Sequence, residues 1–288
     1  MGEEGSVLHR AVSADKQAHA VEAGATTTSD TLLDGALRLR QPSRGHRVGT
    51  DAILLAAAAP AAGVGRLIDI GAGVGAVGLA LAQRHAGAQV VLVEIDAALA
   101  TLAGENANLN NLGERVRVIA ADFMSPAERR KAGLAAGAAD LIVTNPPFFE
   151  PARVRASADT GRARAHVLDE SGGANPLRRW IVAALALLAP GGCFVMIHRP
   201  EALPDFLAAC AQRLGSLAVL PVHPHAEAPA HRLLLGGVKG ARGPLRLLPA
   251  LALHEPEGGF MPLAQAIHRG ETMIDLGLRG RAARQRAR

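Results

Sequence analysis

The sequence predicts an α/β protein with a doubly wound, mostly parallel sheet, and three observations carry that prediction. Short segments that are apolar throughout alternate with longer segments suited to helices, as in parallel sheets covered on both faces. A glycine-rich turn follows the first of these apolar segments. The chain has 288 residues, of which 49% are hydrophobic and 20% charged, so it can bury a large core and is not wholly disordered.

The apolar segments and their boundaries predict the individual elements. Seven strands are expected over residues 66–70, 89–94, 115–120, 140–144, 193–198, 216–222 and 232–239. Helices are expected over residues 52–59, 76–85, 97–110, 176–188 and 201–214, the first of them capped by Thr50 or Asp51. The last two strands flank a loop rich in proline and histidine, which predicts an antiparallel hairpin at the C-terminal side of the sheet.

Composition predicts four regions along the chain. Residues 1–30 are polar, lack periodicity and are expected to be a flexible leader. Residues 31–62 form a small N-terminal extension of short strands and one helix, and residues 63–240 form the α/β domain. Residues 241–288 form a C-terminal extension that we expect to be poorly ordered from about residue 270.

Several classes of protein are disfavoured by the sequence. No run reaches the roughly 18 apolar residues of a membrane helix, and the N-terminus does not resemble a secretory signal. The only cysteines are Cys193 and Cys210, too few for a disulfide framework or a zinc site. We therefore expect a cytoplasmic protein without a metal and without a membrane partner.

Positive charge is concentrated at the edges of the predicted domain. The formal net charge is +5, and residues 35–50 contain four arginines and no acid. Arginine binds phosphate in two-pronged fashion, which favours a polyanionic partner such as RNA over a merely solvated surface. The residues expected to contact RNA are Arg38, Arg40, Arg44, Arg153, Arg155 and the arginine-rich C-terminal tail.

A glycine turn, residues 69–75, closes the first strand and opens a helix. Gly71, Gly73 and Gly75 let the backbone turn sharply and approach a ligand closely. Glu94 ends the second strand 19 residues beyond Gly75, where a carboxylate can bind ribose hydroxyls. The same spacing also fits a dinucleotide site, so NAD or FAD stays open on this motif alone.

Two carboxylates favour S-adenosylmethionine over a dinucleotide. Asp69 can hold a cationic amino group but would repel a pyrophosphate, and Asp122 can accept from an adenine amino group, with Phe123 offering a face. At this point the chain resembles the class I S-adenosylmethionine-dependent methyltransferases, which have a Rossmann-like fold. The resemblance implies that Asp69, Gly71 and Gly73 surround the methionine part, Glu94 binds the ribose and Asp122 the adenine.

Residues 144–148, Thr-Asn-Pro-Pro-Phe, end the fourth strand and carry the most specific signal. Two prolines stiffen the turn, so the Asn145 side-chain oxygen and the Pro146 carbonyl can both accept hydrogen bonds from a planar amino group. Such acceptors draw the N–H bonds out of plane and stabilise the charge that develops as the amine attacks. Phe148 offers a stacking face for an unstacked base. The catalytic residues are thus expected to be Asn145, Pro146, Pro147 and Phe148.

This motif resembles that of methyltransferases acting on amino groups of adenine, guanine, cytosine or glutamine. Residues 47–55, Arg-Val-Gly-Thr-Asp-Ala-Ile-Leu-Leu, resemble the bacterial tRNA(Val) adenine-N6 methyltransferases, in which this segment leads into a helix beside the cofactor. Thr50 and Asn145 are therefore added to the expected cofactor-binding residues. Phe148 stands where many members have tyrosine, which keeps the ring and removes a hydroxyl.

The leading hypothesis is an S-adenosylmethionine-dependent methyltransferase of adenine N6 in tRNA. The alternatives are a guanine-N2 rRNA methyltransferase and a protein glutamine N-methyltransferase, which share the Asn-Pro-Pro-Phe chemistry. A dinucleotide-dependent oxidoreductase and a catalytically silent RNA-binding module remain as rivals, both disfavoured by the presence of Asp69 and Asn145.

Overall fold

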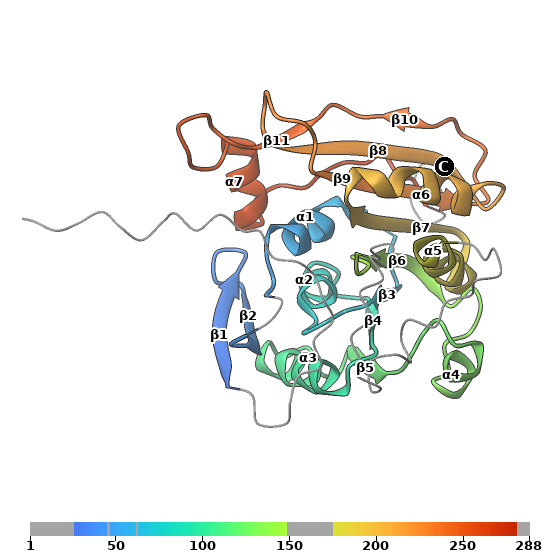
Figure 1. Ribbon diagram of the computed structural model, residues 1–288. Helices are drawn as coiled ribbons and strands as arrows, with labels where there is room; N and C mark the ends of the chain where they lie inside the picture. The colour runs from blue at the N-terminus through green and yellow to red at the C-terminus, as the bar shows by residue number, and fades with distance from the viewer. Residues whose placement is uncertain (1–25, 45–46, 62, 149–174, 281–288) are drawn as a thin grey trace, which may run out of the picture.

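The computed structural model describes residues 26–44, 47–61, 63–148 and 175–280. Its central sheet has the strand order β10-β8-β9-β7-β6-β3-β4-β5, with β11 also pairing with β8 (Figure 1). The strands are β3 (Arg66–Ile70), β4 (Gln89–Glu94), β5 (Val116–Ala120), β6 (Ala139–Thr144), β7 (Leu188–His198), β8 (Leu214–His225), β9 (Arg232–Lys239), β10 (Arg246–Leu247) and β11 (Leu251–His254). Strand β9 runs antiparallel to both neighbours, and all other pairings in this sheet are parallel. The doubly wound α/β fold is therefore confirmed, as is the hairpin β8–β9.

Helices cover both faces of the sheet, as the apolar strands require. Helices α1 (Thr50–Ala58), α2 (Ala76–Arg84) and α3 (Ala97–Leu109) lie on one face, and α5 (Pro176–Leu187) and α6 (Leu203–Cys210) lie on the other (Figure 1). Side chains alternate between the two apolar clusters along each central strand: on β6, Leu141 and Val143 join the first cluster and Ile142 the second. A sheet buried on both faces explains why these strands have no polar side.

A second, two-stranded sheet precedes the main one. It pairs β1 (Thr27–Leu32) with β2 (Leu37–Pro42) and docks on α3 through two asparagine amides. Asn106 accepts from the backbone N–H of Arg40 at 2.7 Å and donates to its carbonyl at 2.9 Å, and Asn110 makes the same pair of bonds with Arg38. The two amides thus take the place of a neighbouring strand for β2 and satisfy backbone groups that would otherwise face a helix.

Two expectations about the N-terminal part are corrected. Strand β1 begins at Thr27, inside the leader expected over residues 1–30, since its backbone pairs with β2; residues 1–25 lie outside the described residues. Helix α1 is capped by the backbone of Gly49 with no side-chain hydrogen bond, rather than by Thr50 or Asp51. Asp51 lies in the first turn of the helix, and its carboxylate binds Arg232 instead.

The C-terminal part is also more ordered than the sequence predicts. Strands β10 and β11 extend the sheet beyond β8, so it has nine strands rather than seven, and the boundary expected at residue 240 falls inside it. Helix α4 (Pro126–Lys131) and helix α7 (Pro262–Arg269) were also not expected. Ile274, Leu276 and Leu278 are buried against the core, so the order ends later than the expected residue 270. Residues 281–288 lie outside the described part of the chain.

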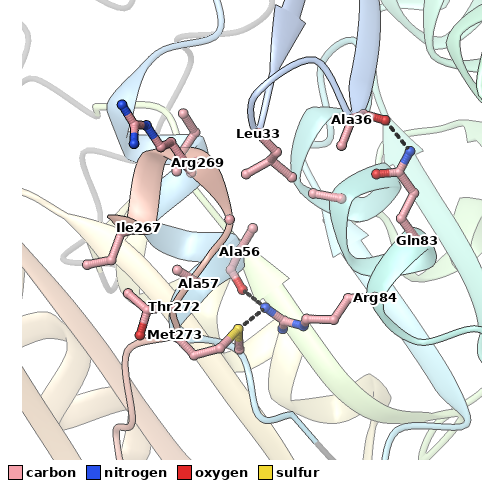
Figure 2. A pocket seen from close by; sticks show the side chains of 13 residues that line it. Leu33, Ala36, Ala56, Ala57, Gln83, Arg84, Ile267, Arg269, Thr272 and Met273 are labelled. Atoms are coloured by element: carbon pink, nitrogen blue, oxygen red, sulfur yellow. Dashed lines mark hydrogen bonds between the residues drawn. The ribbon is translucent and has the colours of Figure 1, made fainter. Parts of the chain in front are cut away.

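A cavity of about 320 Å³ lies between the turn of the β1–β2 sheet, α1, α2 and α7 (Figure 2). Arg84 reaches into it from the end of α2 and donates to the carbonyls of Ala56 and Ala59 at the end of α1. Burial lowers the pKa of Arg84 to about 10. The cavity contains none of the expected site residues, because the glycine turn lies at the opposite end of α2.

Within the described residues, no helix combines the length and the apolar content needed to cross a bilayer.

Candidate active site

The strand register brings the two sequence motifs together at one edge of the sheet. Ile70, the last residue of β3, is the register partner of Thr144, the last residue of β6. The Thr144 hydroxyl donates to the Ile70 carbonyl at 2.8 Å and accepts from the Trp180 indole N–H at 3.1 Å. The glycine turn and the Asn-Pro-Pro-Phe motif therefore leave neighbouring parallel strands at the same level, about 5 Å apart.

The backbone of the glycine turn is left-handed at each of its three glycines. Gly71, Gly73 and Gly75 have φ angles of 70°, 56° and 90°. A Cβ at Gly75 would lie 2.9 Å from Leu92, and one at Gly71 would lie 3.3 Å from Trp180, whereas a Cβ at Gly73 would meet nothing within 4 Å. The space above Gly73 is thus open to a ligand, while the other two glycines are needed for packing.

Asp69 is buried directly below this turn. Its side chain is 2% exposed and accepts from the Gly78 backbone N–H at 2.8 Å. Burial raises the pKa of Asp69 to about 7, an effect that the Gly78 hydrogen bond reduces and the nearby Glu94 charge increases. No basic side chain accompanies this carboxylate in the interactions described, so a cationic ligand would relieve its burial.

Glu94 ties the second strand to the turn. Its two oxygens accept from the backbone N–H groups of Gly73 at 2.8 Å and Asp96 at 3.0 Å. Each carboxylate oxygen can accept a further bond, so hydroxyl donors remain possible here. Ile95, between Glu94 and Asp96 in the chain, is a hydrophobic side chain that is 68% exposed.

The residues expected near an adenine are only partly placed to contact one. Asp122 is half-buried, and its Oδ1 accepts from the Met124 backbone N–H at 2.8 Å. Phe123 is 3% exposed and packs edge-on against Trp180, with ring centres 4.3 Å apart. Phe123 is therefore almost fully buried in the free protein, so a stacking contact with an adenine stays a prediction. The exposed Ile95 is the apolar side chain that this edge presents instead.

Asn145 has an unsatisfied acceptor. Its Oδ1 is buried and accepts no hydrogen bond within the part of the chain that is described. Native proteins pair nearly all such atoms, since a buried oxygen left without a donor costs about 1–3 kcal/mol. This oxygen follows the strand beside the open glycine turn and is available to a donor on a bound ligand.

Two arginines and a histidine lie around the ring of Phe148. The Arg199 guanidinium carbon lies 4.0 Å from the ring centre and that of Arg232 lies 5.4 Å from it. His198 contacts the ring edge-on at a centre-to-centre distance of 5.0 Å. Arg232 also donates through Nε to both oxygens of Asp51, at 3.1 and 3.0 Å. The start of α1 is thereby joined to the substrate motif.

The chain is similar to known methyltransferases. The Methyltransferase small domain family matches residues 46–172. The tRNA1(Val) (adenine(37)-N6)-methyltransferase of Pectobacterium carotovorum is 34% identical over 191 residues, which cover 66% of this chain and 73% of that protein. Its counterpart in Serratia proteamaculans is 37% identical over 192 residues, covering 66% and 69% of the two chains. The chain belongs to the tRNA1(Val) adenine-N6 methyltransferase family.

A solved structure supports the same fold class for this family member. The crystal structure of a predicted O-methyltransferase, protein Atu636 from Agrobacterium tumefaciens, has a TM-score of 0.64 and 28% identity, covering 78% of this chain and 98% of that one. The protein is a Rossmann-like, S-adenosylmethionine-dependent methyltransferase. The site fits that cofactor, because Asp69 is a buried carboxylate whose described interactions include no basic side chain, and the space over Gly73 is open.

Several residues of this methyltransferase site escaped sequence reasoning. Trp180 is half-buried, and its indole bonds to Thr144 next to Gly71. Ile95, Arg199 and Arg232 carry no motif of their own. Thr50 lies half-buried at the start of α1, and its role at the cofactor stays a prediction. Within the described ranges, no group of three or more acidic, histidine or cysteine side chains is arranged to bind a metal.

Proposed function

We propose that this chain methylates the N6 amino group of an adenine in tRNA, and that adenine 37 of tRNA1(Val), named for its relatives, is the first substrate to test. The observation that carries the proposal is the orphan Oδ1 of Asn145 beside the glycine turn. An N6 amino group has two N–H donors and no basic lone pair. It therefore matches a pair of fixed acceptors better than a hydroxyl substrate, which has a single O–H donor.

Each half of the site has a defined task in this proposal. When bound, S-adenosylmethionine supplies an electrophilic methyl group. Asp69 binds its amino group, Glu94 its ribose, and Asp122 with Ile95 its adenine; the backbone around Gly71, Gly73 and Gly75 leaves room for it. This assignment keeps Asp122 from the sequence analysis and replaces Phe123 by Ile95, because Ile95 is exposed and Phe123 is not.

The substrate half acts on the amine. Asn145 Oδ1 and the Pro146 carbonyl accept hydrogen bonds from its two N–H groups, which makes the nitrogen lone pair available for attack on the methyl group. The methylated nitrogen then loses one proton, and no strong base is needed because the product cation is acidic. Pro147 stiffens the turn, and Phe148 provides the aromatic surface for the extruded base.

The test of this function is a product analysis. The purified protein is incubated with labelled S-adenosylmethionine and an unmodified tRNA1(Val) transcript, and the RNA is digested to nucleosides. We expect N6-methyladenosine, and its loss when position 37 is guanosine. Label in N2-methylguanosine or in protein would replace the proposal by one of the two alternative activities.

For the wider RNA contact we propose Arg38, Arg40 and Arg44, along with Arg153, Arg155 and the C-terminal tail. Arg153, Arg155 and residues 281–288 lie outside the described residues. Arg38 donates to the Leu109 carbonyl at 2.8 Å and Arg40 lies 3.5 Å from Glu105, so part of each side chain is engaged. Arg44 is exposed and makes no such contact among the described residues. Replacing all three with alanine should raise the KM for tRNA and flatten its salt dependence, by roughly one unit of slope per lost phosphate contact.

A further inference from the structure

Arg199 and Arg232 place two guanidinium groups at the ring of Phe148, and neither is used by the assignment above. They come from different strands, since Arg199 follows the end of β7 and Arg232 begins β9, and they meet because His198 is the register partner of Leu233. Both guanidinium carbons lie within 6 Å of the ring centre, the range of a cation–π contact.

Arg232 is held in a fixed orientation. Its Nε donates to both oxygens of Asp51, and its Nη1 donates to the His231 carbonyl at 2.9 Å. The two side chains are only 21% and 19% exposed, so this ion pair is weakly screened by solvent. Its Nη2 has no partner among the described residues, which leaves a preoriented donor beside the aromatic ring.

Arg199 lies closer to the ring but is less constrained. At 4.0 Å from the ring centre its guanidinium covers Phe148, and no carboxylate within the described ranges pairs with it. A base that stacks on this surface must displace the guanidinium. A displaced guanidinium keeps its charge and all its donors, so it gains most by moving to an anion carried by the incoming ligand.

We propose that Arg199 and Arg232 form a phosphate clamp for the target nucleotide, holding the RNA backbone beside the base that stacks on Phe148. The inference rests on the proposed function and adds the group that it recognises. The charge balance supports it: Asp51 neutralises one guanidinium, and the second positive charge is left for a backbone phosphate. A nucleotide stacked on the ring carries its phosphates within about one arginine side-chain length of the base, and arginine binds such oxygens in two-pronged fashion.

The clamp is tested with Arg199→Gln, Arg199→Lys and Arg232→Gln, and with Arg117→Gln as the matched control. Arg117 is an exposed arginine on β5, at the opposite edge of the sheet from β8. We expect each clamp variant to raise the KM for a tRNA1(Val) transcript about tenfold or more and to lower the slope of log KM against log salt by about one unit. Arg199→Lys should recover part of the loss. The control should change neither quantity by more than a small factor.

Two further measurements separate the clamp from a structural role. S-adenosylhomocysteine affinity, measured by calorimetry, should stay the same in Arg199→Gln. Because Arg232→Gln leaves Asp51 without its partner, the double variant Asp51→Asn/Arg232→Gln is compared with it; both should show the same loss of salt dependence. If Arg199→Gln lowered kcat and left the salt slope at the wild-type value, Arg199 would only support the Phe148 ring, and the clamp would be wrong.

The decisive experiment removes the charge from the RNA instead. Transcripts are prepared with a neutral methylphosphonate on either side of the target adenine. Wild-type protein should bind one of these transcripts more weakly than the unmodified transcript. The Arg199→Gln/Arg232→Gln variant, which already binds the unmodified transcript weakly, should lose little further affinity. Additive losses would overturn the clamp while leaving methylation intact. Wild-type protein that methylates no tRNA would overturn the proposed function and the clamp with it.

Discussion

The Trp180 indole donates to the Thr144 hydroxyl at 3.1 Å, and the same hydroxyl donates to the Ile70 carbonyl at 2.8 Å. This relay joins α5 to the ends of β3 and β6, and it fixes the spacing between the cofactor turn and the substrate motif. The Trp180 ring also lies against Gly71, so one side chain contacts both halves of the site.

Thr144→Val should therefore weaken both stability and cofactor binding. The substitution keeps the shape of a fully buried residue and leaves the Ile70 carbonyl and the Trp180 N–H without their partner. An unsatisfied buried group costs about 1–3 kcal/mol, which denaturant unfolding would measure as a lower midpoint. Thr144→Ser keeps the hydroxyl and serves as control. Equal stability of the Val and Ser variants would contradict the relay.

Gly73→Ala should reduce cofactor affinity much more than stability. A left-handed alanine costs about 1–2 kcal/mol, and nothing lies within 4 Å of its Cβ in the free protein, so the fold tolerates it. The methyl group would occupy space that the cofactor needs. Calorimetry with S-adenosylhomocysteine measures the affinity, and thermal unfolding measures the stability.

Gly104→Ala provides the matched control for that substitution. Gly104 lies inside α3, and the nearest atom to its Cβ is 4.0 Å away. Alanine should stabilise the helix by up to about 1 kcal/mol and leave the affinity unchanged. A Gly73→Ala variant that bound as tightly as Gly104→Ala would show that the cofactor does not approach the turn.

Ile95→Ala should lower the affinity for S-adenosylhomocysteine several-fold without loss of stability. The side chain is 68% exposed in the free protein, so its removal costs the fold little, and burying it under an adenine ring gains roughly 25 cal/mol per Å² of apolar surface. Phe123→Leu should have the opposite profile, lower stability with less effect on affinity, because Phe123 is buried. If Ile95→Ala bound normally, the adenine would have to lie elsewhere.

The affinity for S-adenosylhomocysteine should increase as the pH rises from about 5.5 to 7.5. Burial raises the pKa of Asp69 to about 7, so the carboxyl group is mostly protonated below that pH in the free protein. The cationic amino group of the ligand favours the carboxylate, lowers its pKa and so releases a proton on binding. Calorimetry at several pH values measures this dependence. Asp69→Asn should bind more weakly with a flat profile over this range, and a flat profile in the wild type would remove Asp69 from the amino-group site.

The raised pKa of Asp69 also makes the stability of the free protein depend on pH. The folded-state pKa lies above the ordinary value of 3.8, so the folded state binds the proton more tightly than the unfolded chain. The stabilising contribution of Asp69 is complete below about pH 4 and is lost as the pH rises through about 7. The difference in unfolding free energy between wild type and Asp69→Asn should follow this course.

Asn145→Ala should lower the turnover number by about 100-fold and leave cofactor affinity nearly unchanged. The amide is proposed to act on the substrate amine, and its oxygen makes no bond within the described protein that the substitution would break. Phe148→Tyr should be mild, because the ring remains, whereas Phe148→Ala should be severe. Near-normal turnover of Asn145→Ala at saturating tRNA would rule out the proposed role.

The order of strands and helices from α1 to β9, apart from α4, and the two motifs followed from the sequence alone. Apolar segments flanked by turn residues specify buried strands locally, and the glycines and prolines restrict their own backbone, so residues 69–75 and 144–148 could be recognised without knowing their neighbours. The family resemblance rested on these segments together with residues 47–55, and the comparisons confirm the family.

Tertiary structure alone decided which side chains meet. The sequence pointed to Phe123 as a surface for an adenine and gave no signal for Ile95, but packing against Trp180 buries Phe123, whereas Ile95 is exposed. Ile274, Leu276 and Leu278 alternate with Asp275 and Gly277, and the sequence does not show what would bury them. In the folded chain they pack in the same apolar cluster as α1 and one face of the sheet. Arg199 and Arg232 lie 33 positions apart and reach Phe148 only through the antiparallel register of β7 and β9. A motif is set by short-range sterics, whereas the register between strands depends on the whole apolar pattern of the sheet, so these contacts became visible only in the folded chain.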